Sequence, residues 1–254
     1  MPYSKQDDRK YRADLEKNIK RLKKEKNAVI LAHNYQRDEI QDIADILGDS
    51  LQLARAATKI DADIIEFCGV RFMAESASIL NPNKKVILPV KEAGCPLADM
   101  INPEKLKALK SQYPDAACVC YVNSAAEVKA ESDVACTSSN AIEVVRSLAN
   151  KRVIFVPDEN LGKYVQSQIP EKEIILWKGF CSTHIRLSEE EVILAKKEHP
   201  QAEFLAHPEC NPEVLKRADQ ICSTGGMFKY ARASKSREFI IGTESGMLYR
   251  LKKE

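Results

Sequence analysis

The sequence has almost no excess charge of either sign and no long apolar run. Its 39 lysine and arginine residues are balanced by 37 acidic residues, which leaves a formal charge of +2. No strongly basic face is implied, so nucleic acid and anionic membranes are not expected as partners. Apolar runs such as 29–32 have the length of a strand and fall far short of the roughly 20 residues that cross a bilayer. These features predict a cytoplasmic protein.

The amino terminus also lacks the apolar core of a signal peptide. Residues 1–27 alternate lysine, arginine, aspartate and glutamate around Leu15, Ile19 and Leu22. This spacing predicts an amphipathic surface helix. The chain has 254 residues, 44% of them hydrophobic, which is enough to bury a core in one large domain or in two to three small ones.

Several familiar motifs are missing. None of the eight cysteines belongs to a C-x-x-C pair, and neither G-x-G-x-x-G nor G-x-x-x-x-G-K-[ST] occurs. These absences argue against a zinc ribbon, a thioredoxin-like redox site and a nucleotide-binding module. Free cysteine usually behaves as a small buried hydrophobic residue. A further signal is needed before any cysteine is assigned to a metal site.

Such a signal comes from an internal repeat. Three segments, beginning at Asn27, Ala116 and Glu203, each show an apolar strand followed by a helical stretch, at 38–47, 125–131 and 212–217. In each segment a polar residue at the strand end precedes a hydroxyl residue by 17 positions: His33 with Ser50, Tyr121 with Ser138, and His207 with Thr224. The strand-end residues are 88 and 86 positions apart. A period of this length indicates a small α/β domain repeated three times.

The second segment shows the domain pattern most fully. Strands are predicted at 116–122, 133–136, 152–156 and 173–177, with helices at 125–131, 141–149 and 161–168. This alternation predicts a parallel sheet covered on both faces and joined by right-handed crossovers. We therefore expect an α/β fold of three αβα sandwich repeats around a pseudo-threefold axis, spanning 1–113 (with the amino-terminal helix), 114–199 and 200–254.

The strand ends carry the candidate site. Ligands of open parallel sheets bind outside the carboxyl ends of the strands, where His33, Tyr121 and His207 lie. Residues two apart in an extended segment face the same way, which adds Tyr35, Asn123 and Glu209. We expect these side chains to point into one central cleft. The other histidines, His184 and His199, carry no such signal and are interpreted as structural.

Ser50, Ser138 and Thr224 each precede a predicted helix, which leaves two interpretations open. Serine and threonine are ordinary helix N-caps. A recurrence at one fixed spacing also suggests a shared role, because a helix N-terminus offers free N–H groups to an anion. Three such positions converging on one axis would bind a small, multiply charged acid or a phosphate.

Two cysteines also hold equivalent positions. Cys95 and Cys181 are 86 residues apart, and each follows the last strand of its repeat near a glycine, which permits close approach of a bulky group. Soft thiolate ligands suit an iron–sulfur cluster or zinc. Cys136 and Cys222 share the 86-residue spacing, but they lie within predicted strands and are expected in the core.

The repeat predicts the position of a third cysteine. Cys95 and Cys181 follow the strand-end residues of their repeats by 62 and 60 positions, so the equivalent position in the third repeat is 267–269, past Glu254. The third repeat is therefore expected to lack its last strand and cysteine turn. We expect Cys95 and Cys181 near each other in a centre without a stable cluster, and Cys210 beside the cleft.

Motifs along nearly the whole chain resemble those of the quinolinate synthase family, in the family's order. They are AHNYQ (32–36), GDS (48–50), GCPLADM (94–100), YVNSAAEVKAESDVACTSSN (121–140), PDENLG (157–162), WKGFCSTH (177–184), HPEC (207–210), STGGM (223–227) and GTESGMLYRLKKE (242–254). The resemblance implies a transferase of NAD (pyridine nucleotide) biosynthesis, which condenses iminoaspartate with dihydroxyacetone phosphate to quinolinate, water and phosphate. Iminoaspartate would come from L-aspartate oxidase or aspartate dehydrogenase.

The resemblance also implies a [4Fe–4S] cluster held by three cysteines, one per domain, whose open iron acts as a Lewis acid. Carried over by motif, its ligands would be Cys95, Cys181 and a cysteine beyond residue 254. Catalytic roles would fall to Tyr35, Tyr121 and Glu209, with Tyr35 and Glu209 as acid–base groups. Substrate contacts would come from His33, Ser50, Tyr121, Asn123, Ser138, His207, Glu209 and Thr224.

A form that ends at Glu254 would then be inactive. Two other functions stay open: a different iron–sulfur hydro-lyase acting on a small carboxylate, and an inactive remnant that binds a dicarboxylate.

Overall fold

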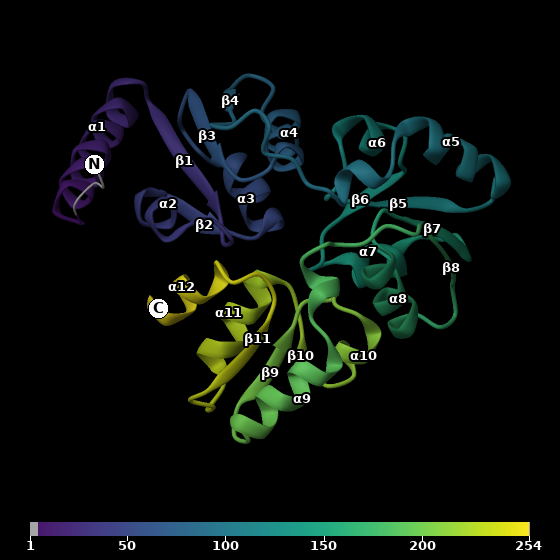
Figure 1. Cartoon of the computed structure of the whole chain (residues 1–254). Coiled ribbons are helices and arrows are strands. Elements are labelled where there is room, and N and C mark those ends of the chain that lie inside the picture. Colours follow the sequence, from purple (N-terminus) through teal and green to yellow (C-terminus); the bar gives the residue numbers. More distant parts are fainter. Residues whose placement is uncertain (1–4, 254) are drawn as a thin grey trace.

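The computed structural model describes residues 5–253, which form three separate parallel β-sheets with helices packed against them (Figure 1). The first sheet has the strand order β2-β1-β3-β4. Its strands are β1 (Ala28–His33), β2 (Ile46–Gly48), β3 (Ile64–Cys68) and β4 (Lys85–Ile87). Its helices are α1 (Lys5–Glu25), α2 (Asp38–Ile43), α3 (Ser50–Ala57) and α4 (Arg71–Leu80), and α5 (Pro103–Gln112) leads to the second sheet.

The amino-terminal helix is confirmed as a surface element. Most of the described side chains of α1 are exposed, and Ile19 packs against the buried side of β1 at Ile30 and Ala32. Residues 1–4 of the predicted segment lie outside the described residues. No helix in the described part of the chain is long and apolar enough to cross a membrane.

The predicted helix at 38–47 is wrong at its end. The helix stops at Ile43 because Ala44 adopts an extended conformation, with ψ of 142°. The backbone N–H of Asp45 then donates to Ile30, and Ile46–Gly48 pair in parallel with the end of β1. The apolar residues Ile43, Ile46 and Leu47 keep a helical spacing, so the pattern alone does not reveal this short strand.

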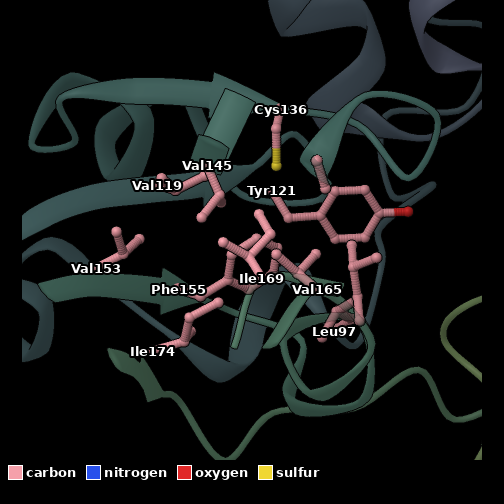
Figure 2. Close-up of a cluster of buried hydrophobic side chains, with 12 residues drawn as sticks. Leu97, Val119, Tyr121, Cys136, Val145, Val153, Phe155, Val165, Ile169 and Ile174 are labelled. Carbon is pink, nitrogen blue, oxygen red and sulfur yellow. The ribbon is translucent and has the colours of Figure 1, made fainter. Parts of the chain in front are cut away.

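The second sheet has the equivalent order, β6-β5-β7-β8. Its strands are β5 (Ala117–Tyr121), β6 (Val134–Cys136), β7 (Arg152–Val156) and β8 (Glu173–Leu176). Its helices are α6 (Ala126–Ala130), α7 (Ala141–Ser147) and α8 (Glu159–Gln168). The predicted strands and helices of this repeat are confirmed to within one or two residues at each end. Figure 2 shows its core, in which Val119, Val153 and Phe155 of the sheet pack against Val165 and other buried side chains.

The third sheet has three strands, in the order β10-β9-β11. They are β9 (Glu203–Ala206), β10 (Gln220–Ile221) and β11 (Phe239–Gly242), and the helices are α9 (Glu189–Glu198), α10 (Pro212–Leu215), α11 (Thr224–Ala233) and α12 (Met247–Lys253). The order matches the first three strands of the other sheets, and the described residues contain no fourth strand. The predicted fold class, with three parallel α/β units of which the third is smaller, is confirmed.

The three units share an equivalent aspartate contact. The carboxylates of Asp45, Asp133 and Asp219 accept hydrogen bonds of 2.6 to 2.7 Å from backbone N–H groups in the first strands of their sheets. The donors lie 15 residues before the aspartate in every case. Each carboxylate thereby ties the start of the second strand to the first strand.

The three units meet at their strand ends. The side chain of Asn34, after β1, donates to Thr224 at the start of α11, and Asn123, after β5, lies 3.5 Å from Glu209, after β9. We propose the domain ranges 1–113, 114–199 and 200–254; their boundaries fall in the loops after α5 and α9.

Candidate active site

One pocket of about 250 Å³ lies where the three sheets meet. It is lined by all of the site residues that the sequence suggests. The first unit contributes His33, Tyr35, Ser50 and Cys95; the second contributes Tyr121, Asn123, Ser138 and Cys181; the third contributes His207, Glu209 and Thr224. Parallel strands of one sheet end on the same edge, and the packing of the three units brings these three edges together.

The hydroxyl residues do not act as the helix caps that their positions suggest. The N-cap of α3 is Asp49, whose side chain accepts from the backbone N–H of Gln52, and the N-cap of α11 is Ser223. Ser50 and Thr224 are instead the first residues of these helices and line the pocket, where the Thr224 hydroxyl also accepts from the side chain of Asn34. The capping interpretation is therefore wrong for these two residues. Ser138 precedes α7 in a loop and also lines the pocket.

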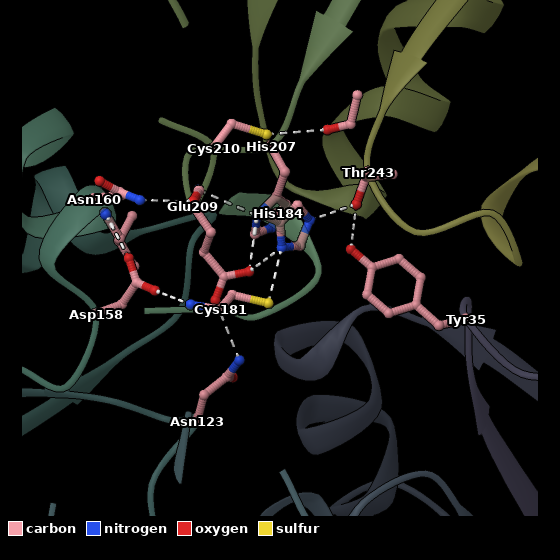
Figure 3. Close-up of polar contacts among 12 residues, drawn as sticks. Tyr35, Asn123, Asp158, Asn160, Cys181, His184, His207, Glu209, Cys210 and Thr243 are labelled. Carbon is pink, nitrogen blue, oxygen red and sulfur yellow. Dashed lines mark hydrogen bonds and ion pairs between the residues drawn. The ribbon is translucent and has the colours of Figure 1, made fainter. Parts of the chain in front are cut away.

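A buried carboxylate organises the centre of the pocket. Oε2 of Glu209 lies 3.1 Å from Nδ1 of His207 and 3.0 Å from Nδ1 of His184 (Figure 3). Although burial opposes its charge, the two imidazoles hold the pKa of Glu209 well below its usual range. Glu209 is therefore ionised at neutral pH. Two imidazole nitrogen atoms hold its carboxylate in place.

The two histidines differ in their charge. Burial lowers the pKa of His207. Burial acts the same way on His184, but hydrogen bonds from its ring to Cys181 and Glu209 outweigh it and raise the pKa of His184 to about 10. The rings stack with centroids 4.5 Å apart. One neutral and one cationic imidazole can stack face to face beside a carboxylate with less repulsion than two cations would have.

His184 is the clearest residue that the sequence interpretation missed. It occupies a 3₁₀ turn three residues after Cys181, and its Nδ1 lies 3.1 Å from the cysteine sulfur. Its Nε2 contacts the Thr243 hydroxyl at 2.8 Å. The sequence signal that could have marked it is its place directly after the repeated cysteine turn. His199, by contrast, lies at the surface and pairs with Glu238.

Two other polar residues were also missed, and they share a signal. Each lies just after the third strand of its unit: Asp158 two residues after the end of β7, and Thr243 directly after the end of β11. The Asp158 carboxylate accepts from the backbone N–H of Cys181 at 3.1 Å, and the Thr243 hydroxyl contacts Tyr35 at 2.5 Å. The ends of the third strands thus add contacts that the ends of the first strands do not supply.

The tyrosines and His33 are all neutral in this pocket. Burial raises the pKa of Tyr35 and of Tyr121 well above the ordinary value, so both phenols keep their protons. Burial lowers the pKa of His33 to about 4. The backbone N–H of Tyr35 donates to Nδ1 of His33, which fits the neutral ring. The pocket therefore offers two phenolic donors beside the ionised carboxylate of Glu209.

Cys95 and Cys181 reach the pocket from different sheets. Burial raises the pKa of the Cys95 thiol to about 11, and the Glu209 carboxylate and Cys181 act in the same direction. A metal centre would have to displace the proton of Cys95 on binding. Two cysteine sulfurs facing one pocket form a soft donor set that fits an iron–sulfur cluster. Ligand atoms of Cys181, His184 and Glu209 also lie within 4.8 Å of one another.

The remaining cysteines of the repeat series lie away from this pocket. Cys136 is buried in the core of the second unit, as expected. Cys222 is only partly buried: it packs beside Met227 and borders a separate polar groove, so its assignment to the core is only partly correct. Cys210, which was predicted beside the cleft, does not line it: the residue is fully buried next to Glu209 in the chain, and its sulfur contacts the carbonyl oxygen of Gly242.

Comparison with known proteins gives one consistent result. Residues 17–254 match the family described as quinolinate synthetase A protein. The chain is 62% identical over 236 residues to the quinolinate synthase of Alkaliphilus metalliredigens, covering 93% of this chain and 78% of that protein. It is 56% identical over 239 residues to that of Caldicellulosiruptor saccharolyticus (94% and 79%), and 57% identical over 233 residues to that of Thermodesulfovibrio yellowstonii (92% and 77%).

Proposed function

The chain belongs to the quinolinate synthetase A family, and we propose on this basis that it is a quinolinate synthase of NAD biosynthesis. The proposed reaction condenses iminoaspartate with dihydroxyacetone phosphate and releases quinolinate, water and phosphate. The observation that carries the proposal is the single pocket in which strand-end residues of three units meet two cysteines. Its size and enclosure suit small acids rather than a macromolecule.

The binding of anionic substrates is proposed to rest mainly on hydroxyl and backbone N–H groups. Among the described residues that line the pocket, none is lysine or arginine. Ser50, Ser138 and Thr224 offer hydroxyl groups, and the first N–H groups of α3 and α11 lie beside two of them. Helix N-termini favour negative charge. These groups would hold carboxylate and phosphate oxygens. A guanidinium group would bind the anionic products strongly as well, and its absence would help their release.

The proton transfers are proposed to use Glu209, Tyr35 and Tyr121. Loss of water and closure of a ring require protons to be taken from carbon and nitrogen and given to leaving oxygen. The ionised Glu209 would accept protons, and the two protonated phenols would donate them. His207 would hold Glu209 in position, and His33, in edge contact with Tyr35, would orient that ring.

The proposed cofactor is a [4Fe–4S] cluster with Cys95 and Cys181 as ligands. The third ligand is proposed at the position equivalent to 267–269, in a chain as long as the relatives. When bound, the cluster would supply an open iron that polarises a substrate oxygen as a Lewis acid. The protein would supply two sulfur ligands from different units and would restrict the access of water to them.

A glutamine substitution tests the role of Glu209. In the full-length chain, reconstituted anaerobically, Glu209→Gln should lower quinolinate formation by at least about 100-fold, because the amide keeps the shape but cannot accept a proton. The visible absorbance of the cluster should be unchanged, since Glu209 is not a proposed ligand. Glu238→Gln, which changes an exposed glutamate paired with His199, is the matched control.

Retained turnover in Glu209→Gln would remove its acid–base role. A full-length wild-type chain that holds the cluster but forms no quinolinate from the two substrates would exclude the proposed activity itself. Dehydration of another small hydroxy acid by that chain would instead favour the hydro-lyase alternative.

A further inference from the structure

The phenol of Tyr35 contacts a residue of another unit. Its phenolic oxygen lies 2.5 Å from Oγ1 of Thr243, which follows β11 in the third unit (Figure 3). Among the described residues, this hydroxyl is the hydrogen-bond partner found for the phenol. Thr243 is not among the residues that line the central pocket. It borders a separate small cavity with His184 and Cys210.

The Thr243 hydroxyl is shared with a second group of the site. Its Oγ1 also lies 2.8 Å from Nε2 of His184, and Nδ1 of the same ring lies 3.0 Å from Oε2 of Glu209. A single hydrogen-bonded chain therefore runs from Tyr35 through Thr243 and His184 to Glu209. It joins the two proposed acid–base residues and crosses all three units.

The hydrogen-bonding capacity of the Thr243 side chain restricts which residues can replace it. A hydroxyl has one donor and two acceptor positions, so it can bond a phenol and an imidazole nitrogen at once, whichever of them donates. Valine has the same shape but neither capacity. Serine keeps both. The chain is therefore expected to depend on the hydroxyl and not on the volume of residue 243.

The surrounding backbone keeps Thr243 close to Tyr35. The Gln41 side chain, in α2 of the first unit, donates to the carbonyl oxygen of Gly246 at 3.0 Å. A Cβ atom at Gly246 would lie 2.6 Å from the carbonyl oxygen of Tyr35, so the 243–246 loop is packed directly on the Tyr35 backbone.

We propose that Thr243 is a positioning residue, whose hydroxyl orients the Tyr35 phenol toward the substrate by tying it to His184 and Glu209. The proposal rests on the proposed function, in which Tyr35 donates a proton. It extends that function by assigning a residue that touches no substrate. Without the Thr243 hydroxyl, no hydrogen bond from the described residues fixes the position of the phenolic oxygen or the direction of its O–H bond.

The test compares Thr243→Val and Thr243→Ser in the full-length enzyme loaded with its cluster. Thr243→Val should lower kcat by about 10-fold or more while KM for dihydroxyacetone phosphate stays within about twofold, because orientation and not binding is lost. Thr243→Ser should restore most of kcat. Thr58→Val is the matched control, because it removes an exposed hydroxyl that bonds only the carbonyl oxygen of Arg55.

A double-mutant cycle separates positioning from a general structural effect. In a Tyr35→Phe background, Thr243→Val should cause little further loss of kcat, since the group that it positions is already absent. Additive losses in kcat would contradict the proposal, as would wild-type kcat in Thr243→Val alone.

A second readout needs neither cluster nor activity. In protein labelled with 3-fluorotyrosine, the ¹⁹F resonance that disappears in Tyr35→Phe belongs to Tyr35. This resonance should shift in Thr243→Val, return in Thr243→Ser and stay unchanged in Thr58→Val. An unmoved resonance in Thr243→Val would overturn the proposal even if activity fell. If the wild-type enzyme formed no quinolinate, the proposed function would fail, and the resonance would still decide whether Thr243 holds Tyr35.

Discussion

The histidines at the strand ends illustrate what can be inferred residue by residue. His33 and His207 hold equivalent positions in their repeats, so the topology of parallel sheets predicts that both reach the central pocket. His184 was not predictable in this way. Its importance comes from Glu209 and Thr243, which lie 25 and 59 residues further along the chain. Contacts of this range depend on how the units pack, and a local spacing does not contain that information.

The neutral state of His33 predicts a pH-dependent stability. The imidazole would take up a proton near pH 6.5 in the unfolded chain, but only near pH 4 in the folded protein. Between these values the unfolded state binds more protons, so the free energy of unfolding should fall as the pH is lowered from 6.5 to 4. The slope from one such group is at most about 1.4 kcal/mol per pH unit.

Urea denaturation at several pH values between 4 and 7 measures this slope. His33→Gln should give a shallower decline than the wild type in that window, because it removes the group that protonates more easily when unfolded. His199→Gln is the control, since that imidazole lies at the surface. An identical slope in His33→Gln and the wild type would show that His33 is not held neutral by the fold.

At the scale of elements, strands were easier to predict than the details of turns. The strands of the second unit could be placed within one or two residues because each is a short apolar run between polar breaks. The short β2 could not, since its apolar residues continue the helical spacing of α2. The aspartates at 45, 133 and 219 recur at the repeat period, but this spacing does not show what they contact. Their carboxylates bond backbone groups, and no side-chain motif reveals such a contact.

The glycines beside the two cysteines have different physical roles. A Cβ atom at Gly179 would lie 2.3 Å from the carbonyl oxygen of Pro157, whereas at Gly94 the nearest atoms would lie 3.7 and 3.9 Å away. Gly179 thus makes room for its own backbone rather than for a bulky ligand. The backbone carbonyl of Gly179 also accepts from Glu159, which ties the Cys181 turn to the start of α8.

This difference predicts unequal effects of the same substitution. Gly179→Ala should lower the free energy of unfolding by about 1–3 kcal/mol, because the added methyl group meets a backbone atom that cannot rotate away. Gly94→Ala, the matched control, should change it by less than about 0.5 kcal/mol. Urea denaturation of both variants measures the two values. Equal losses would show that the turn after β8 can relax and that the close approach is unimportant.

At the scale of the whole molecule, the site depends on how the three units pack, because every unit contributes side chains to it. The repeat could be predicted from spacing, and so could the smaller third sheet, because both follow from periods of 86 and 88 residues. The hydrogen-bonded chain from Tyr35 to Glu209 could not, since it uses one residue of the first unit, one of the second and two of the third. A pocket built in this way also distributes the proposed cluster ligands, one to each unit.

That distribution leads to a prediction about cluster retention. Residues 1–254 provide Cys95 and Cys181 at the positions that the repeat marks for thiolates, and the relatives are longer, with 78% of the length of one of them covered. A polypeptide of residues 1–254 should therefore retain less iron and sulfide after anaerobic reconstitution and desalting than the full-length chain, because two thiolates hold a cluster less firmly than three.

In the full-length chain, Cys95→Ser and Cys181→Ser should each lose the visible absorbance, whereas Cys222→Ser, outside the central pocket, should keep it. Equal iron and sulfide in the short and long chains would contradict the assignment of a third ligand near 267–269. A short chain that loses its absorbance on Cys210→Ser would point to that buried cysteine as the third ligand instead.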